Sequence, residues 1–156
     1  MGCLRQHDHL RSIGKPPGRF LDVRGDRDLA KGSTRIWLTG HSLGAALATY
    51  LAADMQVELT GVPCALNVAL FASPKPGSFG YSDGYMARVS SFTDVMFAAD
   101  IVPQLPGYPA EPLKGGGPGH NVITLPRQGP GAPPAPELDP VTNHATETYA
   151  AMLRAL

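Results

Sequence analysis

The pentapeptide Gly40-His41-Ser42-Leu43-Gly44 is the stretch of sequence that decides the fold. It follows an apolar run at 35–39 and precedes a helix-forming stretch at 45–55. A serine in a sharp turn between a strand and a helix is exposed as a nucleophile. The two glycines are expected to let the strand and helix backbones approach without Cβ clashes. The new helix directs its positive N-terminal end at the serine, where negative charge would develop during acyl transfer.

The composition of the chain indicates a single loop-rich domain and argues against a nucleic-acid-binding or membrane-spanning protein. The chain has 156 residues, with 13 basic and 13 acidic side chains and a net charge of zero, so it is expected to form one domain and to bind no nucleic acid. Glycine (18) and proline (16) are frequent, which is typical of a loop-rich protein. No apolar stretch is long enough for a transmembrane helix. The N-terminus lacks the apolar core of a secretory signal, and Cys3 and Cys64 are not expected to pair, so localisation stays unassigned.

Strands and helices are expected to alternate along most of the chain. Apolar runs predict strands at 35–39, 65–72, 93–98 and 121–125, and helical periodicity predicts helices at 43–56, 78–88 and 141–156. This order predicts an α/β fold with a mostly parallel sheet flanked by helices. Residues 1–32 are expected to form a poorly ordered arm, and 33–156 one domain with a proline-rich loop at 103–140.

The first predicted helix carries two kinds of apolar side chain. Its large apolar residues recur at helical spacing, whereas its alanines allow close packing on a sheet. The large residues are Leu43, Leu47, Tyr50, Leu51 and Met55.

Three residues supply the side chains that serine-hydrolase chemistry requires, in the order serine, aspartate, histidine that is typical of α/β-hydrolases. A serine hydroxyl is a poor nucleophile unless a histidine takes its proton, and that histidine needs a carboxylate to hold its tautomer. Ser42 is followed by Asp100, just past the third predicted strand, and by His144, at the start of the last predicted helix. These three residues are the candidate nucleophile, acid and base.

Other residues compete for the roles of acid and base. Asp94 lies within a predicted strand and would point sideways, and Asp139 lies in the proline-rich loop. His120 precedes a strand and therefore lies at the wrong end of the sheet, whereas His41 is expected to pack or to form a hydrogen bond within the turn. Asp100 and His144 are the preferred candidates.

Four segments resemble those of the class 3 lipases, the triacylglycerol-lipase family of α/β-hydrolases. They are Thr39–Ala48 around the serine, Phe71–Gly77 after the second predicted strand, Asp100–Pro106, and Asn143–Tyr149 in the closing helix. The resemblance covers roughly residues 33–153, and four motifs in the right order are more specific than any one. Lys75 stands where the family often has arginine, a change without an obvious catalytic consequence.

The resemblance implies a function and a set of roles. Ser42 would be the nucleophile, Asp100 the orienting acid, His144 the base, and the backbone N–H of Leu43 one oxyanion-hole donor. The reaction would be hydrolysis of a carboxylic ester of a lipid, or of a small ester, through an acyl-enzyme, without a cofactor or metal.

One departure from the family bears on activity. Family members carry a long segment before the serine turn, which includes a second oxyanion donor, and here 41 residues precede Ser42. The chain is therefore expected to be the C-terminal part of a lipase with impaired activity. The strand at 35–39 would lie at an edge of the sheet with Trp37 exposed. The alternative interpretation is an inactive remnant that pairs, through this edge, with a partner or with a second copy of itself.

Overall fold

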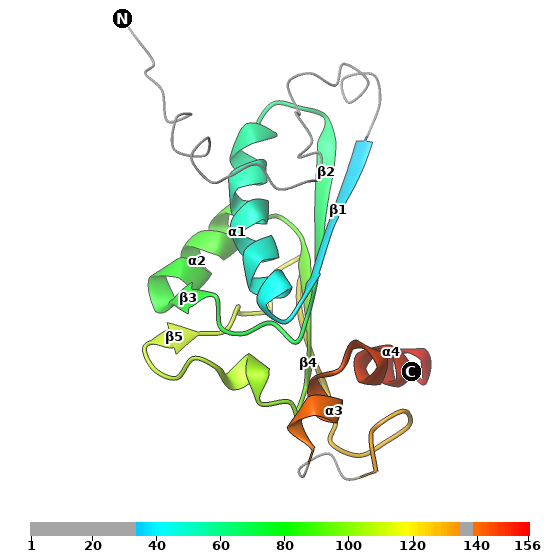
Figure 1. Cartoon of the computed structure of the whole chain (residues 1–156). Helices are drawn as coiled ribbons and strands as arrows, with labels where there is room; N and C mark the ends of the chain where they lie inside the picture. The colour runs from blue at the N-terminus through cyan, green and yellow to red at the C-terminus, as the bar shows by residue number, and fades with distance from the viewer. Residues whose placement is uncertain (1–33, 135–138) are drawn as a thin grey trace, which may run out of the picture.

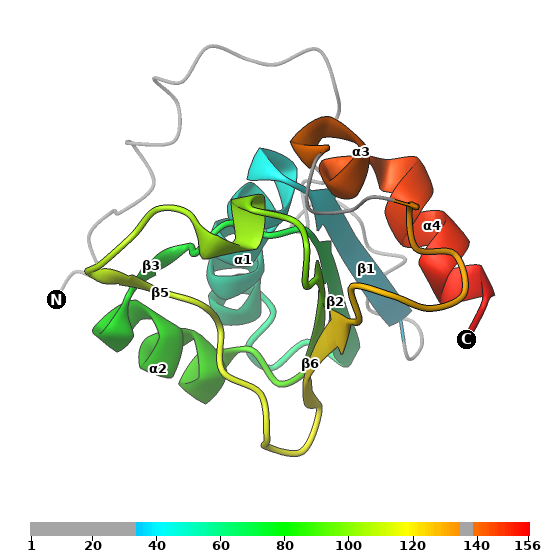
Figure 2. The ribbon, with the colours of Figure 1, turned by 90° about the horizontal axis from the view of Figure 1, so that it is seen from below.

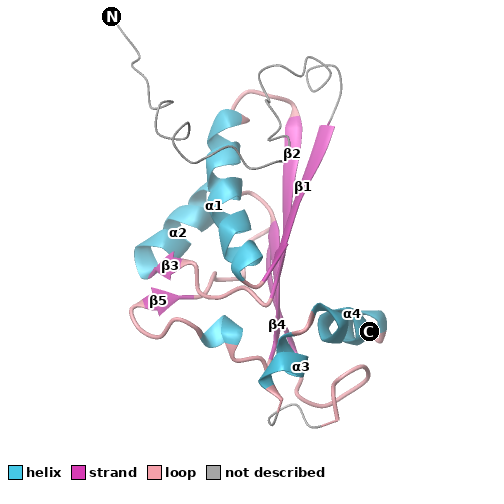
Figure 3. Ribbon diagram, in the orientation of Figure 1, coloured by secondary structure: helices cyan, strands magenta, loops and turns pink. Residues whose placement is uncertain are grey.

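A parallel four-stranded sheet forms the centre of the computed structural model, which describes residues 34–134 and 139–156. The strand order is β1-β2-β4-β6, and every neighbouring pair is parallel. The elements are β1 (Thr34–His41), α1 (Leu43–Glu58), β2 (Cys64–Phe71), β3 (Gly77–Ser78), α2 (Phe79–Arg88), β4 (Phe92–Phe97), a short 3₁₀ helix (Val102–Gln104), β5 (Ala110–Glu111), β6 (His120–Leu125), α3 (Pro140–His144) and α4 (Thr146–Arg154) (Figures 1 and 3).

The sheet separates two layers of helices. Figure 1 shows the sheet nearly edge-on, with α1 and α2 on one side and α3 and α4 on the other, and Figure 2 shows the same layers from below. Leu66, Val68 and Leu70 of β2 belong to the core cluster beneath α1 and α2. Val95 and Phe97 of β4 belong to a second cluster with Tyr149 and Met152 of α4. Alternate residues of a strand thus serve opposite faces.

The predicted α/β class with a parallel sheet is confirmed, and the observed strands lie within two residues of the predicted ones at either end. The short antiparallel pair β3–β5 was not predicted. The single closing helix predicted at 141–156 is wrong, because the chain forms α3 and α4 with a break at Ala145. The arm predicted at 1–32 lies outside the described residues. No described helix has both the length and the apolarity needed to cross a membrane.

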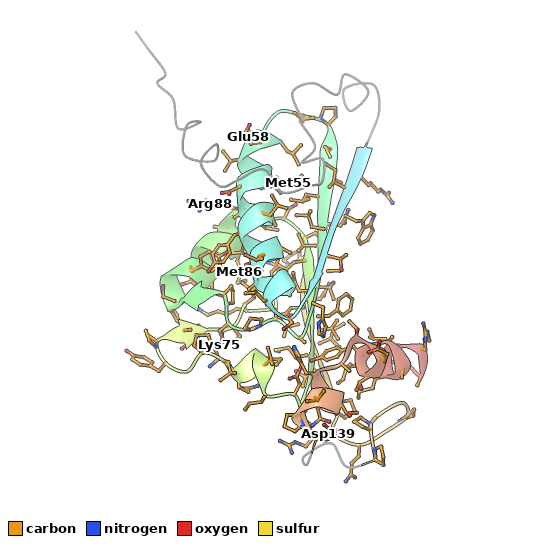
Figure 4. All side chains as sticks on the ribbon, viewed as in Figure 1. Met55, Glu58, Lys75, Met86, Arg88 and Asp139 are labelled. Atoms are coloured by element: carbon orange, nitrogen blue, oxygen red, sulfur yellow. The ribbon has the colours of Figure 1, made fainter. Side chains whose placement is uncertain are left out.

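Helix α1 packs through its small residues. Ala45, Ala48, Thr49 and Ala52 are buried, whereas the large apolar residues at its start, Leu43 and Leu47 in particular, are exposed. Figure 4 shows Met55, further along the helix, which packs partly against the core. Short side chains let the helix backbone approach the sheet closely, so Leu43 and Leu47 lie on the outer surface instead of in the core.

Strand β1 is an edge strand among the described residues, as predicted, since only β2 pairs with it. Its Trp37 is 67% exposed. It stands between Ile36 and Leu38, which pack in the core beneath α1, so its side chain points to the opposite face of the sheet. An apolar edge strand of this kind is prone to pairing with another chain.

Candidate active site

Ser42 occupies the turn between β1 and α1 in a conformation that few residues adopt. Its φ is 59° and its ψ is −133°, in the positive-φ region that costs energy for any residue other than glycine. Its backbone N–H donates a hydrogen bond to the carbonyl oxygen of Phe71, at 3.0 Å, at the end of the neighbouring strand. The turn holds the serine at the carboxyl edge of the parallel strands, between strand and helix.

The two glycines of the turn differ in how much space a side chain would find there. A Cβ added to Gly40 would lie 2.3 Å from the carbonyl oxygen of Gly44, so close packing of β1 against α1 requires glycine at position 40. A Cβ added to Gly44 itself would meet nothing within 4 Å. The steric expectation is therefore confirmed for Gly40 and wrong for Gly44.

The three candidate residues lie side by side, although they come from distant parts of the chain. The Nε2 atom of His144 is 2.7 Å from the Oγ of Ser42, and its Nδ1 is 2.8 Å from the Oδ2 of Asp100. An ionised carboxylate only accepts hydrogen bonds, so Nδ1 carries the proton and Nε2 is left to accept the proton of the serine hydroxyl. This tautomer is the one that a general base beside a serine needs.

Asp100 is buried, and both of its carboxylate oxygens accept hydrogen bonds. Its side chain is 0% exposed, and its Oδ1 accepts a hydrogen bond from the backbone N–H of Val102 at 2.9 Å. Its Oδ2 accepts a second bond, from the hydroxyl of Tyr149 at 2.8 Å, beside the bond from His144. That hydroxyl in turn accepts from the backbone N–H of Phe97 at 3.0 Å. Burial, followed by the nearby charge of Asp100, raises the pKa of Tyr149, which keeps the phenol protonated and able to donate.

The break between α3 and α4 places His144. Helix α3 ends at His144, and Ala145 has extended backbone angles (φ −66°, ψ 142°) before α4 begins. The buried Asn143 donates from Nδ2 to the carbonyl oxygen of Ala99 at 3.1 Å, which ties α3 to the loop that carries Asp100. The base and the acid are thereby held to each other by neighbouring residues as well as by their own contact.

The competing residues have other roles. Asp139, labelled in Figure 4, accepts from the backbone N–H groups of Val141 and Thr142 and caps α3; the hydroxyl of Thr142 is the main cause of its lowered pKa. His120 lies at the start of β6, where its Nε2 is 2.7 Å from the carbonyl oxygen of Val89. Within the described residues, the hydroxyl of Ser42 is hydrogen-bonded to His144 and to neither of these two.

Asp94 is buried within β4, and its side chain is only 2% exposed. Its Oδ1 has no hydrogen-bond partner in the described part of the chain. Burial raises the pKa of this carboxyl to about 7. It lies two positions along the strand from Phe92, which belongs to the core beneath α1 and α2, so its carboxyl lies on that face of the sheet, opposite the face that α4 and Tyr149 cover.

Sequence reasoning missed the contact of Tyr149 with Asp100, and it left the packing of His41 unspecified. The ring of His41 lies 4.7 Å from that of His144 and 5.9 Å, edge-on, from that of Tyr149, centroid to centroid. A buried tyrosine needs a partner for its hydroxyl, and this was the one available signal. The partner could not be identified, because Tyr149 and His144 would lie on different faces of one continuous helix.

A depression of about 440 Å³ opens beside the imidazole. It is lined by His41, Ile101, Val102, Pro140, Val141, His144, Ala145, Thr146 and Glu147. Most of these side chains are apolar, and Ile101 and Val141 are 53% and 81% exposed. Such a surface suits the apolar part of a small ligand. The described residues hold no group of three His, Cys, Asp or Glu side chains arranged to bind a metal.

Comparison with known proteins agrees with the resemblance noted in the sequence. The family model "Lipase (class 3)" matches residues 26–109, a range that includes Ser42 and Asp100. The chain is 36% identical over 94 residues to "Phospholipase A1-II 6" of Oryza sativa subsp. japonica, and the match covers 53% of this chain and 22% of that protein.

Two further proteins are similar to parts of the chain. It is 33% identical over 72 residues to "Lipase ZK262.3" of Caenorhabditis elegans, which covers 46% of this chain and 20% of the relative. The crystal structure of M37 lipase aligns with a TM-score of 0.44 and 28% identity, over 49% of this chain and 23% of that one. The matches thus span about a fifth of the curated relatives' length. The chain belongs to the class 3 lipase family.

Proposed function

We propose that this chain is a serine hydrolase that cleaves carboxylic esters of lipids, with Ser42 as nucleophile, His144 as base and Asp100 as orienting acid. One observation carries the proposal: the continuous hydrogen-bonded series from Asp100 through His144 to Ser42. The strained serine turn and membership of a lipase family support it further.

The reaction proceeds in two steps. Nε2 of His144 takes the proton of Ser42 while Oγ attacks the ester carbonyl, and the imidazolium formed then gives that proton to the leaving alcohol. The carbonyl oxygen becomes an oxyanion beside the backbone N–H of Leu43, one of the first N–H groups of α1, which have no partner within the helix. A water molecule, deprotonated by His144, then cleaves the acyl-enzyme and regenerates Ser42.

The substrate class is inferred from the family and from the apolar depression. The two curated relatives are named as a phospholipase and a lipase, both of which act on lipid esters. The depression adjoins His144, the group that protonates the leaving alcohol, so it would receive the alcohol side of the ester. Its apolar lining favours an alcohol with hydrocarbon next to the ester bond.

Covalent labelling with a fluorophosphonate tests the proposal. The wild-type chain is expected to be labelled at Ser42, the Ser42→Ala variant not at all, and the His144→Ala variant strongly less. His120→Ala is the matched control, since it removes an imidazole that lies away from Ser42 and should leave labelling intact. Failure of the folded wild-type chain to react would refute the assignment.

Pairing of two chains through β1 is a second candidate role. It is favoured by the edge position of β1 and the exposure of Trp37. Sedimentation velocity over a range of concentrations would show a dimer that dissociates on dilution and that Trp37→Lys weakens. A chain that stays monomeric throughout excludes this role.

A further inference from the structure

Tyr149 is placed to control the acid of the candidate active site. We propose that its hydroxyl is a positioning group: it fixes the Asp100 carboxylate in the orientation in which that carboxylate holds His144. The inference rests on the proposed function and adds a fourth side chain to the arrangement.

The hydroxyl of Tyr149 is held in a fixed direction. It accepts a hydrogen bond from the backbone N–H of Phe97, the last residue of β4, at 3.0 Å. With that contact made, its single proton points to the Oδ2 of Asp100 at 2.8 Å. The side chain is 2% exposed, so water does not compete for either bond. The hydroxyl thereby links the carboxylate to the backbone of the central sheet and fixes its orientation.

Asp100 needs a contact of this kind because it lies outside regular structure, between β4 and the 3₁₀ helix, where no helix or strand fixes its carboxylate. Its Oδ1 accepts a hydrogen bond from the N–H of Val102, the first residue of that 3₁₀ helix and only two positions along the chain. Its Oδ2 meets both Tyr149 and His144, so the hydroxyl acts on the oxygen that receives the imidazole proton. Loss of the hydroxyl leaves this oxygen with His144 as its one donor among the described residues.

The ring and the hydroxyl of Tyr149 have separable roles. The ring packs edge-on against His41, which lies against His144. Replacement by phenylalanine keeps this packing and removes the two hydrogen bonds alone. Any change in Tyr149→Phe therefore reports on the hydroxyl.

Tyr85 provides a matched control on the opposite face of the sheet. It is also 2% exposed, and its hydroxyl has no hydrogen-bond partner within the described residues. It packs in the cluster beneath α1 and α2, away from Asp100. Tyr85→Phe removes the same atom from an equally buried ring without touching the acid.

Proton NMR of the Nδ1–H of His144 tests the proposal independently of activity. A proton shared between imidazole and carboxylate resonates far downfield and stays visible only while the bond is held and shielded from water. We expect this resonance in the wild type and in Tyr85→Phe, and its broadening or loss in Tyr149→Phe. A resonance equally sharp in all three proteins overturns the proposal.

Ester hydrolysis provides the second measurement. Loss of a hydrogen bond to a charged group is expected to lower kcat about tenfold in Tyr149→Phe with KM nearly unchanged, because the acid acts in the transition state. If the wild type lacks activity but its resonance disappears in Tyr149→Phe, the proposed function fails and the positioning role stands. If kcat falls while the resonance is unchanged, the positioning role is wrong and the hydrolase assignment stands.

A second variant serves if Tyr149→Phe does not fold. Ortho-fluorotyrosine at position 149 keeps the ring and the hydroxyl but makes the hydroxyl a stronger donor. The stronger bond draws charge on Oδ2 away from His144, so the Nδ1–H resonance should move upfield. An unmoved resonance would contradict the role assigned to the hydroxyl.

Discussion

Each face of the sheet carries a buried aspartate and a buried tyrosine, but the two pairs differ in their hydrogen bonds. On the α4 side, Asp100 and Tyr149 are joined by a hydrogen bond and tied to the backbone. On the α1 and α2 side, Asp94 and Tyr85 each have a buried oxygen without a partner among the described residues. All four residues are 2% exposed, so burial does not separate the two pairs.

The difference lies in the donors around each carboxylate. Three donors surround Asp100, and one of them is the imidazole of His144. No donor among the described residues is hydrogen-bonded to Oδ1 of Asp94, and burial raises the pKa of this carboxyl to about 7, which favours the neutral acid. The charge of Asp94 also contributes to the raised pKa of Tyr85, after burial and the neighbouring Tyr81. Burial of an aspartate therefore indicates a candidate reactive site only where hydrogen-bond donors, such as an imidazole, surround the carboxylate.

The largest expected effect separates the two aspartates by activity. Asp100→Asn replaces the acceptor of His144 with an amide that can impose the wrong tautomer, and kcat should fall about 10⁴-fold. Asp94→Asn should leave kcat within about twofold of the wild type, because Asp94 takes no part in the hydrogen bonds that join Ser42, His144 and Asp100. Steady-state hydrolysis of a soluble ester measures both. Equal losses in the two variants would remove the distinction between the two faces.

The next effect concerns stability and pH. Because the pKa of Asp94 is about 7 in the folded chain and about 4 in an unfolded chain, the unfolded state loses its proton first as pH rises. The free energy of unfolding should therefore fall between about pH 4 and pH 7, by up to about 4 kcal/mol from this residue.

Asp94→Asn removes this titration. Its free energy of unfolding, minus that of the wild type, should grow from pH 4 to pH 7 and then level off. Urea unfolding at a series of pH values measures the difference. A difference that is constant with pH would show that Asp94 does not carry a raised pKa in the folded chain.

The smallest effect compares the two tyrosines by stability. Tyr149→Phe leaves the N–H of Phe97 and an oxygen of Asp100 short of a partner, and should cost about 1–3 kcal/mol. Tyr85→Phe removes a hydroxyl that has no hydrogen-bond partner among the residues the structure describes, and should change stability by less than about 0.5 kcal/mol or increase it. Thermal unfolding of both variants provides the comparison. A greater loss in Tyr85→Phe would reveal a partner for that hydroxyl.

The elements that sequence reasoning predicted are those with local signals. Apolar runs and the serine turn identify the strands and the helix that follows, and the chain order of serine, acid and histidine singles out Ser42, Asp100 and His144. Their catalytic roles remain predictions. Gly40 could be interpreted from the motif because its clash with Gly44 lies within four residues of chain.

The features that sequence reasoning could not predict depend on contacts between distant segments. Helix α1 lies so close to the sheet that only short side chains fit between them. Ala48 and Ala52 are therefore buried, whereas Leu47 is exposed. The break at Ala145 brings Tyr149 back to β4, and helical periodicity contains no signal for such a break. The unpartnered oxygen of Asp94 depends on what packs against β4 and has no signature in the strand's own sequence.

Trapping the acyl-enzyme tests the central claim most directly. The chain would be mixed with a p-nitrophenyl ester, quenched with acid during the first turnover, and mapped by peptide mass spectrometry. We predict that the mass of the acyl group appears on the peptide containing Ser42 in the wild type and is absent in Ser42→Ala. Ester hydrolysis that continues in Ser42→Ala, or an acyl group found on another residue, would contradict the account.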